Sequence, residues 1–340
     1  MILYFGNMLS RHGYSPSFIE SFTPKLQEKY EVVSVSNKKN MLLRLLHMAS
    51  TLLHNRKNTD LVLIDSFSTK AFIYTYVIAV MCQLLKIPYI PILHGGAFQQ
   101  RLSKSPKMSK KIFRHSYNNV SPSLFLKEVF ETDGYDVIYI PNFITIENYH
   151  CKKRMTIRPR LLWVRAFHRI YNPQMAIKVL YELTKKYDNV ELCMVGADKD
   201  GTLYDVKRLI KELGLEKQVK FTGFLPKNEW LELSREYDIF VNTTNFDNHP
   251  ISVIEAMALG LPVVSTNAGG MPYLVKDGQD GLLVECNDID AMIQKIVDLI
   301  ENPDLAQKLA KSGRNKVEEF GWNKVKKEWF KIIDEIKKGN

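Results

Sequence analysis

The chain has 340 residues, of which 45% are hydrophobic and 25% are charged, and its formal net charge is +10. This composition is typical of a soluble globular protein, and the length predicts about two domains. The four cysteines are widely scattered without a Cys-x-x-Cys pair, which argues against a structural zinc site and a disulfide framework and suits a reducing compartment.

Short β-rich runs alternate with longer helical patterns along the chain. We expect strands at residues 2–5, 32–35, 61–64, 89–93 and 137–140, then at 161–164, 191–195, 220–222, 239–242, 263–265 and 282–284. The helical patterns between most of them predict two parallel sheets covered by helices. Because the segment 148–159 is polar, basic and without apolar periodicity, we expect domains at 1–155 and 156–320, followed by a C-terminal helix at 321–340.

Two features bear on location. The N-terminal residues enter the first strand directly, without a basic leader, so we expect no signal peptide. The longest apolar run, residues 71–85, is shorter than the about 20 residues that a membrane-spanning helix needs, and it predicts a buried helix. We therefore expect a cytoplasmic protein that does not span a membrane.

Positive charge gathers in the first domain. Residues 1–155 contain 20 Lys+Arg and 10 Asp+Glu, and the remainder has 27 of each (47 − 20 and 37 − 10). Basic amphipathic stretches lie on anionic membranes, bind nucleic acid or are solvated faces of packed helices. We interpret the first such stretch, residues 38–57, as a packed helix. For the second, limited by Pro106, membrane contact and a solvated face stay open; its cations are Arg101, Lys104, Lys107, Lys110, Lys111 and Arg114.

The second domain contains a stretch that changes from loop to helix between two acids, Asp247 and Glu255. Pro250 favours a helix start, so the amides near Ile251 and Ser252 have no helical partner and suit an anion such as a diphosphate. Asp247 lies just outside this helix start, and Glu255 projects from the second turn. The two acids therefore suit two hydroxyl-bearing parts of one ligand, on either side of a phosphate.

This stretch resembles the donor-site motif of the retaining glycosyltransferases of family 4. That motif is Glu, seven residues, Glu, then Ala-Met-Ala-x-Gly-x-Pro-Val-Val; here Asp247 replaces the first Glu, and the rest follows through to Gly269-Gly270. The resemblance implies an α/β protein with the GT-B fold, in which two Rossmann-like, doubly wound parallel-sheet domains face each other across a cleft. It further implies an acceptor in the first domain, a nucleotide sugar in the second, and a C-terminal helix that crosses back to the first.

The same resemblance implies roles for single residues. Arg165 aligns with the family's diphosphate-binding Arg, but residues 170–171 stand where Lys-Gly is expected, so His168, Arg169 or the following helix start replaces the Lys. Gly223 matches the strand that flanks the nucleotide base.

Weaker matches fall in the first domain. The loop ending at Gly13 follows the first strand, where family members hold a glycine loop against the donor. His94 follows the strand 89–93 at an edge where ligands collect, and its imidazole suits a sugar or phosphate oxygen.

The resemblance therefore implies a retaining transferase that moves a sugar from a nucleotide sugar, by default a UDP-sugar, to a hydroxyl of a lipid-linked or polysaccharide acceptor. Glu255 would hold the ribose, Asp247 a sugar hydroxyl, and Arg165 with the amides after Pro250 the diphosphate. No Asp-x-Asp motif stands near the donor stretch, so we expect neither a metal nor another cofactor.

Two other functions stay open: a nucleotide-sugar epimerase of the same fold, and a basic nucleic-acid-binding protein. No recognised binding motif or aromatic–basic stripe favours nucleic acid, which we do not expect as a partner. The cations of the first domain instead suggest a peripheral protein at the inner face of a membrane.

Overall fold

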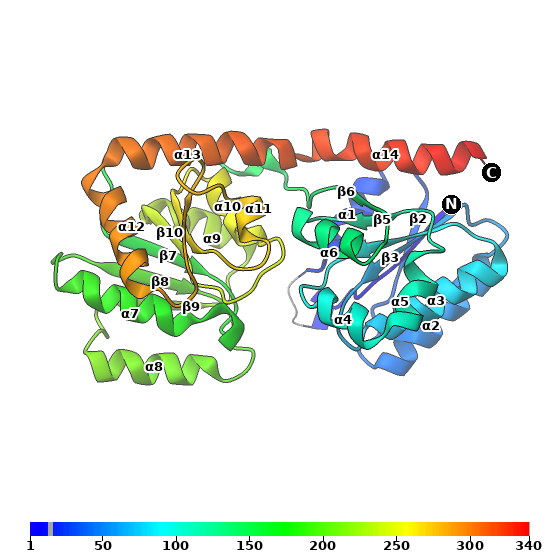
Figure 1. The fold of residues 1–340 in the computed structure, drawn as a ribbon, viewed down its shortest axis with the longest axis horizontal. Helices are drawn as coiled ribbons and strands as arrows, with labels where there is room; N and C mark the ends of the chain where they lie inside the picture. The colour runs from blue at the N-terminus through cyan, green and yellow to red at the C-terminus, as the bar shows by residue number, and fades with distance from the viewer. Residues whose placement is uncertain (13–15, 340) are drawn as a thin grey trace. The chain divides into compact units, whose positions relative to one another are not determined.

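The structure is a computed structural model that describes residues 1–12 and 16–339, and the chain divides into two compact units. Unit 1 consists of Met1–Pro141 with Lys326–Asn340, and unit 2 of Asn142–Val325. This boundary falls earlier than residue 155, because Ile144 and Tyr149 pack into a core of unit 2. Each unit is an α/β fold around a six-stranded parallel sheet, which confirms the expected fold class (Figure 1).

Unit 1 has the strand order β2-β1-β3-β4-β5-β6. Its strands are β1 (Ile2–Phe5), β2 (Val32–Val35), β3 (Leu61–Ser66), β4 (Tyr89–Leu93), β5 (Asn119–Ser121) and β6 (Val137–Tyr139). Its helices are η1 (Ser10–His12), α1 (Phe18–Leu26), α2 (Met41–Asn55), α3 (Phe72–Leu85), α4 (Phe98–Lys104), α5 (Pro106–Phe113) and α6 (Leu124–Thr132). β5 is missing from the strands expected from the sequence, because three residues beginning with a polar one carry too little periodic signal.

Unit 2 has the strand order β12-β11-β10-β7-β8-β9. Its strands are β7 (Arg160–Val164), β8 (Glu191–Val195), β9 (Val219–Gly223), β10 (Ile239–Asn242), β11 (Val263–Thr266) and β12 (Leu282–Val284). Its α-helices are α7 (Pro173–Thr184), α8 (Thr202–Leu213), α9 (Lys227–Leu233), α10 (Ile251–Ala258), α11 (Met271–Leu274), α12 (Ile289–Glu301) and α13 (Pro303–Val317). Short 3-10 turns are η2 (Ile146–Asn148), η3 (Arg169–Tyr171), η4 (Ser234–Glu236) and η5 (Glu318–Phe320).

Side chains of the central strands of unit 2 alternate between two cores. Leu161 and Trp163 of β7 face one core with α7 and α12, whereas Leu162 faces the other with α10. Period-two alternation sends successive side chains to opposite faces of a sheet, and helices bury both faces here. The strands therefore read as nearly continuous apolar runs.

The last helix, α14 (Trp322–Gly339), begins in unit 2, and its residues from Lys326 belong to unit 1. There Trp329 packs on Phe22 with ring centroids 4.8 Å apart. Asp334 accepts a hydrogen bond of 2.8 Å from the Tyr30 hydroxyl and pairs with Lys29 at 2.6 Å. Within the described residues, no helix combines the length and apolarity needed to cross a bilayer.

Candidate functional site

The two middle strands of unit 2 mark a change of direction in the chain. From β7 the chain proceeds outward to β8 and β9, whereas from β10 it proceeds the other way to β11 and β12. Ligands of open parallel sheets bind outside the carboxyl ends of the strands at such a switch point. Arg165 directly follows β7, and Asp247 lies in the loop after β10. The fold thus brings two predicted site residues to this point.

Arg165 and Asp247 form an ion pair with 2.5 Å between Nη2 and Oδ2, and both side chains are 14% exposed. The guanidinium also lies over the Tyr171 ring, 5.0 Å from its centroid. Tyr171 belongs to the pair of residues that stand where the resemblance leads one to expect Lys-Gly. In place of a lysine, this segment therefore provides an aromatic ring that packs against Arg165. The Arg165 Nε is buried, and no described group accepts its hydrogen. A buried charged donor without an acceptor suits a site that takes up an anion.

The start of α10 lies at the same edge of the sheet. Val253 and Ile254 both donate their amides to the Pro250 carbonyl at 3.2 Å, so the helix leaves the amides of Ile251 and Ser252 without a helical acceptor. The Ser252 hydroxyl oxygen is also buried without a hydrogen-bond partner among the described residues. Together these groups supply hydrogen-bond donors and the positive end of a helix dipole.

The glycine pair of the motif holds the Asp247 loop by close backbone approach. A Cβ on Gly270 would lie 1.7 Å from the Asn248 carbonyl oxygen, and one on Gly269, whose φ is +59°, would lie 2.3 Å from that of Asp247. The Gly270 amide donates to the Asp247 carbonyl at 2.7 Å. Only glycine fits both positions, which explains in physical terms why the pair completes the motif.

Glu255 lies on the second turn of α10 and is 6% exposed. Its Oε1 accepts a hydrogen bond of 2.7 Å from the Tyr149 hydroxyl and pairs with Lys227 Nζ at 2.7 Å. Both contacts engage Oε1, and no described group is bonded to Oε2. Burial and the nearby carboxylate raise the pKa of Tyr149, so the phenol stays a donor. The carboxylate is thus fixed by one oxygen, and the other has no bond to a described group.

The other residues predicted for the donor site have different surroundings. Arg169 projects into solvent with 83% of its side chain exposed and pairs with Asp200 at 3.3 Å, rather than with the start of α10. His168 accepts a hydrogen bond from the Ile170 amide and lies 3.8 Å from the same Asp200. Gly223 ends β9 with φ of +69°. Gly13 lies outside the described residues.

Three residues near these groups escape sequence reasoning. Gly196 follows β8, and a Cβ there would lie 1.8 Å from the Arg165 carbonyl oxygen, so glycine is needed for Arg165 to reach its position. A glycine directly after an expected strand is a signal that could have been read. Tyr149 and Lys227 reach Glu255 from distant parts of the sequence, and nothing in their local patterns indicates that contact.

His94 lies in unit 1, where it follows β4 at the carboxyl edge of that sheet. Its Nε2 lies 2.9 Å from Asp65 Oδ1, which also accepts the Tyr4 hydroxyl at 2.7 Å. The rings of Phe18 and Phe67 flank the imidazole at 4.9 and 5.5 Å between centroids. The side chain of His94 is 9% exposed, so these neighbours fix its orientation.

The predicted cationic stretch forms two helices, which meet at Pro106. α4 ends at Lys104 and α5 starts at Pro106, where proline suits the first helical turn. Arg101 is engaged within the fold, because its Nε donates to the Ser68 carbonyl at 2.8 Å. The other five cations are exposed: Lys104, Lys107, Lys110, Lys111 and Arg114.

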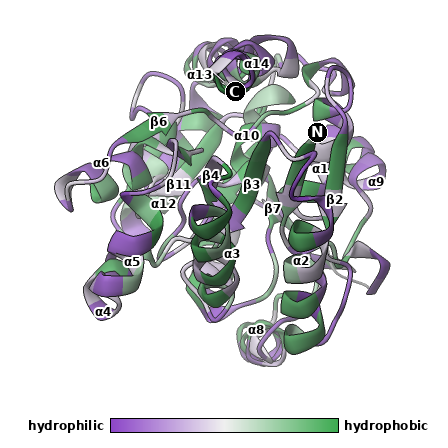
Figure 2. Ribbon diagram, turned by 90° about the vertical axis from the view of Figure 1, so that its right-hand side faces the viewer, coloured by the Kyte–Doolittle hydropathy of each residue, from purple (hydrophilic) through white to green (hydrophobic). Residues whose placement is uncertain are grey.

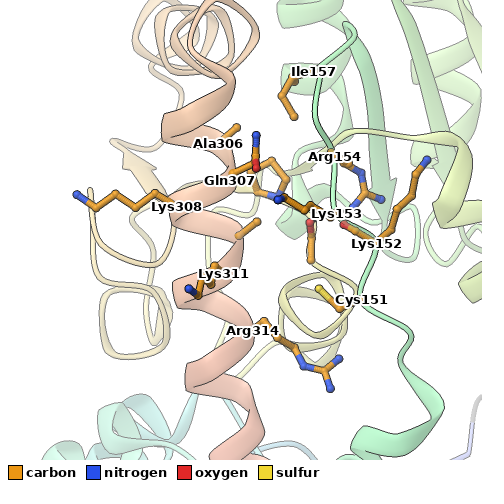
Figure 3. Close-up of a pocket in the computed structure, with 13 residues that line it drawn as sticks. Cys151, Lys152, Lys153, Arg154, Ile157, Ala306, Gln307, Lys308, Lys311 and Arg314 are labelled. Atoms are coloured by element: carbon orange, nitrogen blue, oxygen red, sulfur yellow. Dashed lines mark hydrogen bonds between the residues drawn. The ribbon is translucent and has the colours of Figure 1, made fainter.

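A hollow of about 530 Å³ lies at the opposite end of α10, between residues 151–157 and α13 (Figure 3). Arg154 donates to the Gly260 carbonyl at 2.9 Å, and Arg314 to that of Ala258 at 2.6 Å, so both arginines satisfy carbonyls at the C-terminal end of α10. Lys308 points away from Arg154. None of the predicted site residues lines this hollow, and we interpret it as a seam in the packing.

Known proteins that resemble this chain include glycosyltransferases. Residues 152–316 match the model of the family described as Glycosyl transferases group 1. An uncharacterized glycosyltransferase of Haemophilus influenzae is 33% identical over 159 residues, which are 46% of this chain and 44% of the relative. The UDP-Gal:alpha-D-GlcNAc-diphosphoundecaprenol alpha-1,3-galactosyltransferase of Escherichia coli is 27% identical over 72% of this chain and 66% of its own length.

Among solved structures, Anabaena Alr3699/HepE in complex with UDP and glucose superposes with a TM-score of 0.77 at 17% identity, covering 98% of this chain and 99% of the other. At that identity the likeness shows the fold alone. The match to the Haemophilus relative spans less than half of that protein's length. The chain therefore has the GT-B fold, and its residues 152–316 match the group 1 glycosyltransferases.

Proposed function

We propose that this protein is a retaining glycosyltransferase that moves a sugar from a nucleotide-sugar donor to an acceptor hydroxyl. The observation that carries the proposal is the cluster at the switch point of unit 2. There Arg165 Nε, directly after β7, and Ser252 Oγ, in the first turn of α10, are both buried without a protein partner among the described residues. These are the residues from which the motif leads one to expect diphosphate contacts.

Each group has a distinct role in the proposed reaction. Cleavage of the bond between sugar and diphosphate leaves negative charge on the departing phosphate oxygens. Arg165 and the amides of Ile251 and Ser252 stabilise that charge, and their fixed positions require little reorganisation. Asp247, which neutralises Arg165 without substrate, accepts a hydrogen bond from a sugar hydroxyl when the phosphate takes over that neutralisation. The cationic and amide groups thereby act in the place of a metal ion, and we propose that none is required.

Glu255 is proposed to bind the nucleoside. A ribose offers two neighbouring hydroxyl donors, and the Oε2 that Tyr149 and Lys227 leave open can accept one of them. Since Lys227 is half exposed at 54%, the ribose can displace it and free Oε1 as well. A UDP-sugar is the default donor, which the UDP in the Anabaena complex supports.

The acceptor is proposed to be a lipid-linked or polysaccharide precursor at the inner face of a membrane, with the protein cytoplasmic and peripheral. The exposed lysines of α4 and α5 support contact with an anionic surface. The diphosphoundecaprenol in the name of the Escherichia coli relative supports a lipid-linked acceptor.

Thermal unfolding with UDP, GDP, ADP, CMP and dTDP tests the donor assignment. A ligand that binds only the native state raises the midpoint temperature of unfolding. At a hundredfold excess over its Kd, the free energy of unfolding increases by about 2.7 kcal/mol. We expect one diphosphate to stand out, and its sugar derivative to be hydrolysed slowly without acceptor. Stabilisation by none of the five, or conversion of a nucleotide sugar to its epimer, would overturn the proposal.

A further inference from the structure

Helix α2 of unit 1 presents leucines to solvent along one side. The exposed fractions are 65% for Leu42, 56% for both Leu43 and Leu46, and 47% for Leu53. Leu42, Leu46 and Leu53 follow at spacings of four and seven residues, so they share one side of the helix, with Leu43 beside them. We call these four residues the leucine stripe.

The packing of α2 on its sheet does not account for this stripe. Met48 and Leu52 are buried at 1% and 0%, so a different side of the helix already supplies the core contact. The interpretation of residues 38–57 as a packed helix is therefore incomplete, because apolar residues extend well beyond the buried side. Contiguous exposed apolar surface of this kind marks an interaction site in soluble proteins.

The neighbouring helix α3 also exposes apolar side chains. It packs against α2 and leaves Ile73 40% and Leu84 79% exposed. Figure 2 shows α2 and α3 predominantly hydrophobic, whereas α5, which also packs against α3, is predominantly hydrophilic. The helices on this face of unit 1 therefore place an apolar area next to a polar one.

The charges on this layer have a single sign. Residues 66–127 contain no Asp or Glu, and within 32–65 the only acids are Asp60 and Asp65. Asp65 is 4% exposed beneath His94, and Asp60 pairs with the N-terminal amine at 2.7 Å. Exposed cations instead flank the apolar helices: Lys38, Lys39, Arg56, Lys57, Lys70 and Lys86, with Lys107, Lys110 and Lys111 on α5.

We propose that the leucine stripe enters the headgroup region of an anionic lipid bilayer, with the flanking cations against the lipid phosphates. A bilayer offers both properties that this face demands: apolar depth for leucines and negative charge for lysines. A second copy of the chain meets the first demand only, because a symmetric contact through this face would bring cations against cations. The inference takes its lipid surface from the proposed acceptor but uses no residue of the donor site.

This proposal differs measurably from attraction by the lysines alone. Charge attraction is screened as the Debye length falls from about 10 Å at 0.1 M salt to about 3 Å at 1 M. Leucine insertion is a hydrophobic contribution and survives that change. Binding should therefore have a salt-sensitive part due to the cations and a salt-resistant part due to α2.

Sedimentation with phosphatidylcholine vesicles, with and without phosphatidylglycerol, measures both parts. The test variant is Leu42→Ser with Leu46→Ser and Leu53→Ser; all three side chains are exposed, so the fold should tolerate the changes. Tyr204→Ser on α8, 72% exposed in unit 2, is the matched control for losing exposed apolar surface. A second variant changes Lys104, Lys107, Lys110 and Lys111 to Gln.

We expect the wild type and Tyr204→Ser to bind anionic vesicles and to keep part of that binding at high salt. The leucine variant should bind at least about tenfold more weakly and lose the salt-resistant part, whereas the lysine variant should keep the salt-resistant part and show a smaller salt-sensitive part. Absence of binding to anionic vesicles, or equal binding by the leucine variant, would overturn the proposal. So would a concentration-dependent dimer that the leucine changes abolish. Donor hydrolysis, measured on the same variants, should be unchanged, which separates failure here from failure of the transferase assignment.

Discussion

The two units share an architecture but use their charged residues differently. Unit 1 holds 22 Lys+Arg and 12 Asp+Glu, so unit 2 holds 25 of each (47 − 22 and 37 − 12). In unit 2 the charges of the site are paired and largely buried, as between Arg165 and Asp247. In unit 1 the excess is on the outer helices. Paired charges fix the geometry for one small ligand, whereas an outward excess of one sign suits an extended surface of opposite sign.

The largest effect should follow from Glu255→Ala. Loss of both proposed bonds to the ribose hydroxyls should lower kcat/KM by the equivalent of about 3–4 kcal/mol, measured with the donor found in the nucleotide screen. Glu191→Ala is a matched control, because Glu191 also accepts a tyrosine hydroxyl and an Arg at the opposite edge of the sheet. Near-normal turnover by folded Glu255→Ala would contradict the assignment of the donor site to unit 2, and the contrast drawn between the two units would no longer hold.

Arg165→Ala should have the next largest effect, and it should depend on the phosphates. We expect UDP binding to weaken by about 2–3 kcal/mol, from the loss of charge-assisted hydrogen bonds, while uridine binding hardly changes. Titration calorimetry with both ligands measures the difference. Arg169→Ala is the control, since its side chain is 83% exposed and paired with Asp200. Equal losses for UDP and uridine would place Arg165 away from the phosphates.

His94→Ala tests whether the two units separate binding from turnover. Because the proposed nucleotide contacts lie in unit 2, the Kd for UDP should stay within error. We expect His94 to donate one hydrogen bond to the transferred sugar, and the loss of that bond should lower kcat about tenfold. His54→Ala, an exposed histidine on α2, controls for the substitution itself. Weaker binding of UDP with an unchanged kcat would indicate that His94 contacts the nucleotide. The proposed nucleotide contacts would then not lie in unit 2 alone.

The fold was accessible from the sequence because both faces of each sheet are buried. Strands such as 239–242 and 263–265 therefore begin with consecutive apolar residues, and the helices between them have a clear period. The motif from Asp247 to Gly270 was accessible for a different reason: its parts are contiguous in the chain. The close approach of Gly270 to the Asn248 carbonyl also requires a glycine, and that glycine is visible in the sequence.

Two features could not be predicted from the sequence: the contacts between segments that are distant in the chain, and which side chains are exposed. Lys227 reaches Glu255 from another helix, and no local spacing encodes that pairing. The leucines of α2 looked like a core-facing side, because apolar periodicity alone does not say how much of a helix its sheet can cover. Arg169 and Arg165 are alike in sequence, yet one is exposed and the other is held under a ring.

The smallest effect should come from Tyr149→Phe, which leaves all the proposed ligand contacts in place. The variant removes one hydrogen bond of 2.7 Å to Glu255 Oε1, while Lys227 still neutralises the carboxylate. The carboxylate gains freedom to rotate, so UDP should bind about 1 kcal/mol more weakly. The preference for UDP over 2′-deoxy-UDP should shrink by a similar factor, because Tyr149 acts only through Glu255, the residue that we propose contacts the ribose. Tyr237→Phe removes an equivalent bond to Glu191, 2.8 Å long, and should lower the melting temperature without changing that preference. If Tyr149→Phe, like Tyr237→Phe, kept the ribose preference of the wild type, Tyr149 would be a packing residue. Lys227 and α10 alone would then hold the Glu255 carboxylate in position.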